Sequence, residues 1–420
     1  MESKPLPGLW KKLARSDKLT VSEATLEKRN AVGDITTNFD LNDEQKMIRD
    51  MIRDFAVAEV EPVAIELDEK AEFPKAAIDK LAQLGILGMT VPQEYGGGGM
   101  DYLSYALVVE ELSRVCASTG ITVAAATSLG IGPILLNGTE EQKQAWLPKL
   151  ATGEFLAAFG LTEPGAGSDS GSTKTTAVLD GDEWVINGQK QFITNPTHAG
   201  LVTITARTDP GSKRTHGISA IVVPTDAPGF SLGSKENKLG IRASDTRELI
   251  FEDCRVPAAN LLGEKDTGFP TFMKTLEGGR ISIGAMALGI AQGSLDKAAV
   301  YAQEREQFGK PISKFQAIGN KLADMGTEIQ AARHLVYHAA RLKDAGRPFG
   351  KEASMAKLYA SEVASRCASH AIQIHGGYGY SKEYHVERYY RDAKLCEIGE
   401  GTSEIQRIVI ARAILKEYEI

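Results

Sequence analysis

The sequence predicts an α+β protein of several domains, in which a helical part is followed by a β part and then by a second helical part. Apolar residues recur with the helical period over residues 40–158, short alternating strands begin at Ala177, and the helical period returns after Gly268. A chain of 420 residues, 42% of them hydrophobic, can bury the cores of two or three domains. We therefore expect an extension (1–39), an N-terminal α-helical domain (40–158), a middle β-sheet or β-barrel domain (159–270) and a C-terminal α domain like a four-helix bundle (271–420).

The extension over residues 1–39 contains Pro5, Pro7 and Gly8 and mixes acidic with basic side chains. It therefore lacks both the apolar core of a secretory signal and the acid-poor character of a transit peptide. We interpret it as a segment that is not cleaved and that packs against a neighbouring subunit. A weak contact of the Trp10 region with a membrane or a partner is the alternative.

The first predicted helix covers residues 45–55 and places its apolar side chains on one face, opposite its charges. These side chains are Met47, Ile48, Met51, Ile52 and Phe55. The glycine run 96–99 interrupts the helical pattern. In the β part we expect strands at 183–186, 202–205, 218–223 and 248–251, which Asp-Gly and Pro-Gly turns separate.

The composition excludes several classes of function. The net charge of −7 and the pI near 5.7 argue against nucleic-acid binding. The longest apolar runs, such as residues 122–134, are shorter than a membrane span, so we expect no stable membrane insertion and a bacterial-type cytoplasmic location. Four cysteines without paired spacing suit a reducing cytoplasm, and His334 and His338 lack the glutamate of a zinc-protease motif, so we expect no metal site.

In the stretch 397–407, one carboxylate residue, Glu400, lies between two glycines in a predicted turn. Ser403 and Gln406 have the spacing of a capping box that opens a helix, which predicts that Glu400 lies in the loop just before that helix. Two interpretations follow from the pattern. Glu400 is either a base placed to reach a substrate or an acidic residue that the helix dipole favours.

Four further motifs decide between these interpretations. They are Phe159–Asp169 with its glycine-rich turn, Glu183–Gly188 followed by Lys190–Asn195, Arg305–Gly309, and Gln373–Tyr380. In this order, over about 250 residues, they resemble the acyl-CoA dehydrogenase family of flavoproteins, and the resemblance runs from about Asp40 to the C-terminus. The family fold agrees with the helix–strand–helix order.

The glycines of the turn 164–168 let backbone N–H groups approach a flat or anionic ligand closely. No Walker lysine follows this turn, and no Rossmann fingerprint opens a βαβ unit, so a flavin ring suits the turn better than a triphosphate. The resemblance implies FAD as the cofactor. It implies that the flavin and the start of the CoA path are lined by Phe159, Leu161, Thr162, Gly167 and Ser168, and that the ring is covered by Phe192, Ile193 and Thr194.

By the pattern alone, Arg305 is a solvated charge on a helix, although arginine also pairs well with phosphate. The resemblance instead implies that Arg305, Gln307 and Phe308 hold the flavin's pyrophosphate and adenine from a neighbouring subunit. It implies a homo-oligomer, a tetramer built as a dimer of dimers. The remaining cofactor contacts that it implies are Gln316, Gln373, Gly376, Gly377, Thr402 and Glu404.

The resemblance also implies a mechanism. Glu400 would take the α-proton of an acyl-CoA while a hydride leaves the β-carbon for flavin N5, which gives the trans-2-enoyl-CoA, and the electrons would pass to an electron-transferring flavoprotein. Some relatives carry the base immediately before an arginine, a place that Gly279 occupies here, with Glu277 two positions away. Glu400 is therefore the expected base. The expected substrate contacts are Ser168, Glu277, Arg280, Gly399 and Gly401.

The substrate is less sharply predicted than the reaction. Many relatives have tyrosine where this chain has Gly399, so the acyl group could be branched, cyclic or aryl, or the glycine could merely relieve backbone strain. Residues 276–281 and 351–357 resemble the short-chain and short-branched-chain subgroup. Two other function classes stay open, namely an acyl-CoA oxidase that uses oxygen and a non-catalytic relative that binds acyl-CoA or nucleic acid.

Overall fold

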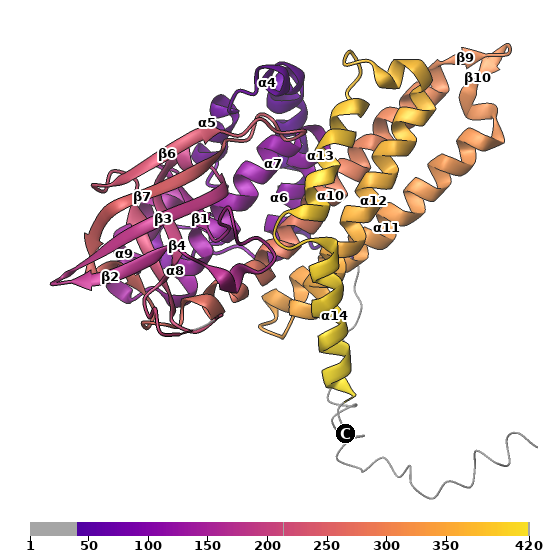
Figure 1. Ribbon diagram of the computed structural model, residues 1–420. Helices are drawn as coiled ribbons and strands as arrows, with labels where there is room; N and C mark the ends of the chain where they lie inside the picture. The colour runs from indigo at the N-terminus through magenta and orange to yellow at the C-terminus, as the bar shows by residue number, and fades with distance from the viewer. Residues whose placement is uncertain (1–39, 213, 419–420) are drawn as a thin grey trace, which may run out of the picture. The chain divides into compact units, whose positions relative to one another are not determined.

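The computed structural model describes residues 40–212 and 214–418, of which residues 42–418 belong to one compact unit (Figure 1). The expected role of the extension 1–39 lies outside the described residues. Within the compact unit, helices precede one mixed sheet, and long helices follow it. The predicted order of a helical, a β and a second helical part is therefore confirmed.

The N-terminal part is helical throughout. Its helices are α3 (Asp43–Phe55), η1 (Ala56–Val60), η2 (Glu61–Val63), α4 (Ala64–Lys70), α5 (Lys75–Gln83), η3 (Gln93–Tyr95), α6 (Tyr102–Val115), α7 (Ala117–Ala124), η4 (Ala125–Ile131), α8 (Gly132–Asn137) and α9 (Glu140–Thr152). A capping box of Asn42 and Gln45 opens α3. Asp101 accepts a hydrogen bond from the Ser104 N–H and thereby caps α6.

The buried face of α3 differs from the predicted one. Ile48 and Ile52 are buried as expected, but Met47 and Met51 are 72% and 41% exposed. The two methionines precede the isoleucines by one residue, which is a rotation of about 100° around the helix axis. An apolar stripe read from the sequence does not distinguish such neighbours, and only the packing of α3 against α6 selects the isoleucines.

Eight strands form a single mixed sheet. They are β1 (Leu156–Gly160), β2 (Thr176–Asp180), β3 (Glu183–Thr194), β4 (Ala199–Arg207), β5 (Ile218–Pro224), β6 (Phe230–Lys235), β7 (Thr246–Pro257) and β8 (Leu261–Leu262). The order is β6-β7-β3-β2-β4-β5-β8, and β1 pairs with β4 in parallel. The four predicted strands are confirmed within β3, β4, β5 and β7. Short helical turns, η5 (Ser170–Ser172), η6 (Pro196–His198) and η7 (Ala258–Asn260), connect some of them.

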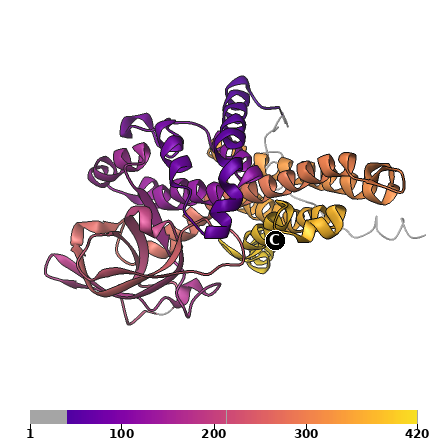
Figure 2. The ribbon, with the colours of Figure 1, turned by 90° about the horizontal axis from the view of Figure 1, so that it is seen from above.

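The N-terminal helices cover one face of the sheet (Figure 2). The core between them joins Ile131, Ile134 and Leu147 to Ala157 of β1 and Val222 of β5. The approach of η4 to β1 is close, because a Cβ at Gly130 would lie 2.6 Å from the carbonyl oxygen of Ala157. Glycine is therefore required at position 130 for this contact.

Long helices make up the C-terminal part and lie side by side in both views (Figures 1 and 2). The elements are α10 (Gly268–Glu304), β9 (Glu306–Gln307), β10 (Lys310–Pro311), η8 (Ile312–Lys314), α11 (Gln316–Asp344), α12 (Gly350–His375), η9 (Gly376–Tyr380), α13 (Val386–Ile398) and α14 (Ser403–Glu417). Helix α10 packs against α6, α11, α12 and α13. The predicted helical bundle is thereby confirmed.

The helical stretch Ala117–Asn137 corrects one expectation about apolar runs. By length and composition it could cross a membrane, with a mean hydropathy of 1.6 over its most apolar window. However, 78% of that window is buried inside the structure, as expected for a core helix. Among the described residues, all four cysteines are free and buried, and no group of three or more metal-ligating side chains occurs.

Candidate active site

Glu400 lies in the turn between the end of α13 at Ile398 and the start of α14 at Ser403, as predicted. The predicted cap is wrong by one residue. Thr402, and not Ser403, is the N-cap, because its Oγ1 accepts a hydrogen bond from the Ile405 N–H. Both residue types cap helices well, so the pattern did not distinguish them.

The backbone of this turn is held in an unusual conformation. Glu400 has φ +54° and Gly401 has φ +95°, and a non-glycine residue in the left-handed region costs about 1 kcal/mol or more. The Gln406 side chain compensates, because its Nε2 donates to the carbonyl oxygens of Gly401 at 2.9 Å and Glu400 at 3.4 Å. The predicted capping partner Gln406 therefore supports the turn itself.

The carboxylate of Glu400 points at helix α10. Its Oε2 is buried without a hydrogen-bond partner, and a Cβ added at Gly279 would lie only 2.0 Å from it. Burial raises the pKa of Glu400 to about 7, although the nearby Lys357 and Arg280 lower it. A carboxylate in this state can accept a proton near neutral pH and has no competing partner inside the protein.

The other predicted acid, Glu277, points elsewhere. Its Oε1 would lie 2.8 Å from a Cβ at Gly350, at the start of α12. Glu277 precedes Gly279 by two positions in α10, which is a rotation of about 200° around the helix axis. The structure therefore does not bring the Glu277 carboxylate to the place that the Glu400 carboxylate occupies.

Two buried cations flank the Glu400 turn. Arg280, a predicted substrate contact, donates from Nη1 to Ser354 Oγ at 3.3 Å, and its Nε has no partner. Lys357 of α12, which the sequence reasoning missed, donates from Nζ to the Gly401 carbonyl at 2.5 Å. A detectable signal existed for Lys357, because it shares a helix face with Ala353, Ala360 and Ala364, which are buried.

The predicted flavin-facing loop 161–168 is anchored by a second pair of residues that were missed. Lys190 of β3 is fully buried, and its Nζ donates to Glu163 Oε1 at 2.7 Å and to Thr205 Oγ1 at 3.1 Å. Glu163 Oε2 also accepts the Lys174 N–H at 2.7 Å. Strand alternation could have revealed Lys190, because it follows Trp184 and Ile186 in the inward register.

The predicted loop residues present an open surface beyond this anchor. Gly167 and Ser168 are exposed, and a Cβ at Gly167 would meet nothing within 4 Å. Phe159 and Thr162 are partly exposed, whereas Leu161 is buried.

The predicted ring-covering residues follow at the end of β3. Phe192 is 63% exposed and has φ +59°, whereas Ile193 is buried and Thr194 half-buried. The next residue, Asn195, is buried with its Oδ1 unpartnered, while its Nδ2 donates to the Thr122 carbonyl. An exposed aromatic ring in a strained backbone and an unused buried acceptor are features that a bound ligand would explain.

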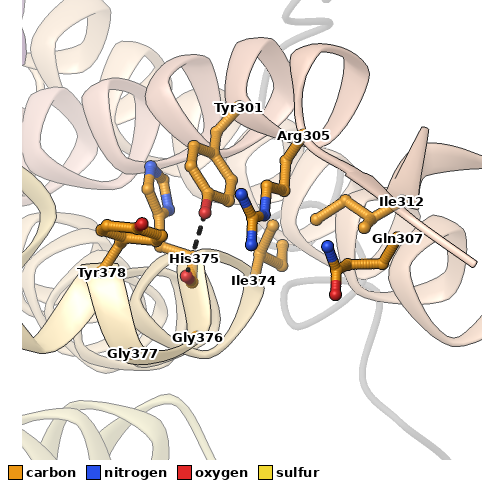
Figure 3. Close-up of a pocket in the computed structure, with 9 residues that line it drawn as sticks. All are labelled: Tyr301, Arg305, Gln307, Ile312, Ile374, His375, Gly376, Gly377 and Tyr378. Carbon is orange, nitrogen blue, oxygen red and sulfur yellow. Dashed lines mark hydrogen bonds between the residues drawn. The ribbon is translucent and has the colours of Figure 1, made fainter.

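The second group of predicted cofactor contacts surrounds an open hollow of about 440 Å³ (Figure 3). Tyr301 stacks on His375 with ring centroids 4.1 Å apart, and its hydroxyl donates to the His375 carbonyl. The Arg305 guanidinium lies 5.4 Å from the Tyr378 ring centre. The hollow is lined by Tyr301, Arg305, Gln307, Ile312, Ile374, His375, Gly376, Gly377 and Tyr378.

The structure thus brings Arg305 and Gln307 together with Gly376 and Gly377, four of the residues that the resemblance implies as cofactor contacts. Gln316 and Gln373 are exposed outside the lining of the hollow. Phe308, at the β9–β10 hairpin, is 93% exposed. Thr402 and Glu404 lie at the other predicted group, beside the Glu400 turn.

The Glu400 turn, with Thr402 and Glu404 beside it, and the hollow at Arg305 lie at different points along α12. Lys357, in the N-terminal third of α12, contacts the Glu400 turn, and Gly376 directly follows the last residue of the helix. Nineteen residues separate them, which corresponds to about 28 Å along a helix. In a single chain, the predicted cofactor contacts therefore do not all surround one binding site.

Comparison with known proteins identifies the class. Three family models match the chain, namely the acyl-CoA dehydrogenase N-terminal domain over residues 42–154, the middle domain over 158–254 and the C-terminal domain over 266–415. The chain is 52% identical over 379 residues to a short-chain-specific acyl-CoA dehydrogenase of Clostridium acetobutylicum, covering 90% of this chain and 100% of that protein. It is 51% identical to the mitochondrial short-chain-specific enzyme of Mus musculus, covering 90% and 92%.

Similar solved structures support the same family. Butyryl-CoA dehydrogenase from Megasphaera elsdenii superposes with a TM-score of 0.88 at 46% identity, covering 90% of this chain and 100% of that one. A chain solved in work on the electron transferring flavoprotein of Acidaminococcus fermentans gives a TM-score of 0.89 at 50% identity, with the same coverage. The chain therefore belongs to the acyl-CoA dehydrogenase family, which is FAD-dependent, and it is an enzyme of the oxidoreductase class.

The contact between Glu400 and Gly279 yields a testable prediction. Gly279→Ala should displace the Glu400 carboxylate, because the new methyl would stand 2.0 Å from Oε2, and should lower turnover at least about tenfold. The measurement is kcat with butyryl-CoA. Gly326→Ala on α11 is the matched control, since a Cβ there meets nothing within 4 Å. Equal activity of the two variants would show that the carboxylate does not depend on this contact.

Proposed function

We propose that the chain catalyses the α,β-dehydrogenation of a short acyl-CoA thioester to the trans-2-enoyl-CoA, with FAD as cofactor and Glu400 as the base. The observation that carries the proposal is the buried, unpartnered Oε2 of Glu400, together with a pKa raised to about 7 by burial. The family membership supplies the reaction class.

The chemistry requires a base for a weakly acidic proton. The α-proton of a thioester leaves most readily to a desolvated carboxylate whose pKa lies near the working pH. Glu400 meets this requirement, and the turn on which it lies holds it in one place through Gln406. The N–H of Glu400 is the protein donor that we assign to the thioester carbonyl, where negative charge develops as the proton leaves.

The residues present fit an FAD. The open surface at Gly167 and Ser168, the exposed ring of Phe192 and the free acceptor of Asn195 suit the flavin ring. When bound, FAD supplies the acceptor for the hydride that leaves the β-carbon. Arg305 and Gln307, with the uncovered backbone at Gly376 and Gly377, suit the pyrophosphate and adenine.

The separation of the two groups of contacts along α12 supports a cofactor site shared between subunits. We infer a homo-oligomer, a tetramer built as a dimer of dimers, in which the hollow at Arg305 completes the site of another copy. We also infer a cytoplasmic enzyme, with domain limits near residues 40, 159 and 271, that passes its electrons to an electron-transferring flavoprotein.

A short acyl chain is the substrate that we propose, because the similar proteins act on short-chain substrates by name. Gly399 remains open to a specificity role. It has φ −66° and ψ 151°, a region that any residue adopts, so the interpretation that this glycine relieves strain is wrong. A Cβ there would make only ordinary contacts, at 3.5 Å or more, with Leu395.

The main test replaces the base. Glu400→Gln should keep the flavin and the affinity for butyryl-CoA but lower the rate of anaerobic flavin bleaching about 10²–10⁴-fold, because an amide of the same shape cannot take the proton. Glu141→Gln, at an exposed position of α9 outside all the predicted contacts, is the control. Near-normal bleaching in Glu400→Gln would disprove the assignment of the base, and peroxide formation by the parent enzyme in air would favour an oxidase.

A second test concerns the shared cofactor site. Arg305→Ala should weaken flavin retention and oligomer stability together, because one guanidinium would serve both the pyrophosphate and the interface. Bound flavin after gel filtration and the molar mass in solution are the two measurements, with Lys143→Ala on α9 as the control. A variant that stays oligomeric and keeps its flavin would refute the shared site.

The third test addresses the acyl cavity. If the acyl group occupies the space beside Gly399, Gly399→Tyr should penalise a bulky branched acyl-CoA relative to butyryl-CoA, since overpacking costs about 1–3 kcal/mol. The measurement is the ratio of the two kcat/KM values in parent and variant, so that a general loss of flavin cancels. An unchanged ratio would mean that the side chain points away from the acyl group.

A further inference from the structure

Helix α12 carries two side chains, one turn apart, that hold the segment bearing the base. Ser361 Oγ lies 2.8 Å from the Cys396 carbonyl at the end of α13 and 2.6 Å from the Lys357 carbonyl in its own helix, and its single hydroxyl hydrogen is shared between these two acceptors. Lys357 Nζ donates to the Gly401 carbonyl at 2.5 Å, immediately after Glu400. The segment 396–401 is thus attached to α12 at both of its ends.

The burial of Lys357 needs an explanation. Its side chain is 0% exposed, and among the described residues no carboxylate lies within ion-pair distance of its ammonium group. A buried ammonium without a partner is costly to the fold, so such a residue is retained only where something offsets that cost. The Gly401 carbonyl accepts its hydrogen bond, and at longer range Cys396 and the carboxylates of Glu400 and Glu397 favour its charge.

Hydrogen bonds to the Gly401 carbonyl hold the turn in place. It accepts one hydrogen bond from Lys357 Nζ and one from Gln406 Nε2, so both acceptor sites of the oxygen are used. Because Glu400 itself has φ +54°, the turn would relax without such support. Fixing the carbonyl that follows Glu400 therefore fixes the direction of its side chain.

The charges that face Glu400 come from few elements. Helix α10 contributes Arg280, α12 contributes Lys357, and α6 contributes the phenols of Tyr102 and Tyr105, which stay neutral because burial raises both pKa values. On α13, the carboxylate of Glu397 is engaged by Lys394 and Ser365. On α14, Gln406 is uncharged, and the exposed Glu404 with its neighbour Arg407 faces solvent.

We propose that Lys357 is a positioning residue for the reaction: it fixes the Glu400–Gly401 turn through one hydrogen bond, and its buried positive charge favours the anionic form of the Glu400 carboxylate. The inference rests on the proposed function, since it assumes that Glu400 takes the α-proton. The opposing effects on the base agree with it, because burial raises the pKa of Glu400 while Lys357 lowers it. Burial lowers the pKa of Lys357 to about 8, which leaves it charged at neutral pH.

Three substitutions at position 357 separate the hydrogen bond from the charge. Lys357→Gln can still donate to Gly401 but has no charge, Lys357→Met has neither, and Lys357→Arg keeps both. Ser361→Ala is the matched control, because it loosens the same segment at Cys396 and leaves the charge in place. The holoenzymes are compared by the single-turnover rate of anaerobic flavin bleaching with butyryl-CoA, from mildly acidic to mildly alkaline pH.

The rate should rise with pH as Glu400 loses its proton. In Lys357→Gln this rise should move upward by about one pH unit while the alkaline plateau stays within about threefold of the parent. Lys357→Met should show the same shift and a plateau lower by about tenfold or more. Lys357→Arg should restore the position of the rise, and Ser361→Ala should lower the plateau without moving it.

Two results would overturn the inference. One is an unmoved pH profile in both Lys357→Gln and Lys357→Met, and the other is a profile for Lys357→Gln that matches Ser361→Ala. Flavin content and Tm are measured for every variant, and if Lys357→Met does not fold, Lys357→Gln and Lys357→Arg still decide the question. Failure of the proposed function is recognised separately, by normal bleaching in Glu400→Gln.

Discussion

The placement of one carboxylate against one glycine is the constraint on which the candidate site depends. Glu400 Oε2 occupies the space that any side chain at position 279 would need, so α10 must present bare backbone there. The long helix α10 is otherwise closely packed, and its flanking residues Arg280 and Ile281 are buried. The Glu400 carboxylate therefore occupies this place only because position 279 of α10 is a glycine.

Electrostatics at this site balance two opposing effects. Burial disfavours the carboxylate anion, and the cations Lys357 and Arg280 favour it, with the result that the pKa of Glu400 is about 7. A carboxylate far below this value would be a poor acceptor of a weakly acidic proton, and one far above it would be protonated in the resting enzyme. The buried cations therefore set the protonation of the Glu400 carboxylate as well as filling space in the core.

The same principle of buried support recurs in the β part. The ion pair of Lys190 with Glu163 ties the loop 161–168 to β3 and β4, while the glycines of that loop stay open to a ligand. In both places a buried lysine holds a backbone turn in position. The side of the turn that faces away from the buried contact is therefore free to contact a ligand, while the buried contact fixes the position of the turn.

The sequence alone determined the order of helices and strands, the turn that carries Glu400 and the family, because local periodicity and short motifs need no knowledge of distant contacts. The resemblance implied that Arg305 and Gly376 are cofactor contacts, and the structure places both in the lining of one hollow. It did not determine which of two adjacent apolar residues of α3 is buried, nor whether Thr402 or Ser403 caps α14. Those choices depend on which neighbours pack against each helix.

Tertiary structure alone decided the contacts between residues far apart in the chain. Glu400 meets Gly279, Lys357 meets Gly401, and Glu163 meets Lys190. Each pair includes a residue that the sequence does not distinguish from others of its kind, namely a glycine in a helix, a lysine in a helix or a lysine in a strand. Their roles arise because folding removes them from water together, and the energy of a buried charge depends on what the fold places beside it.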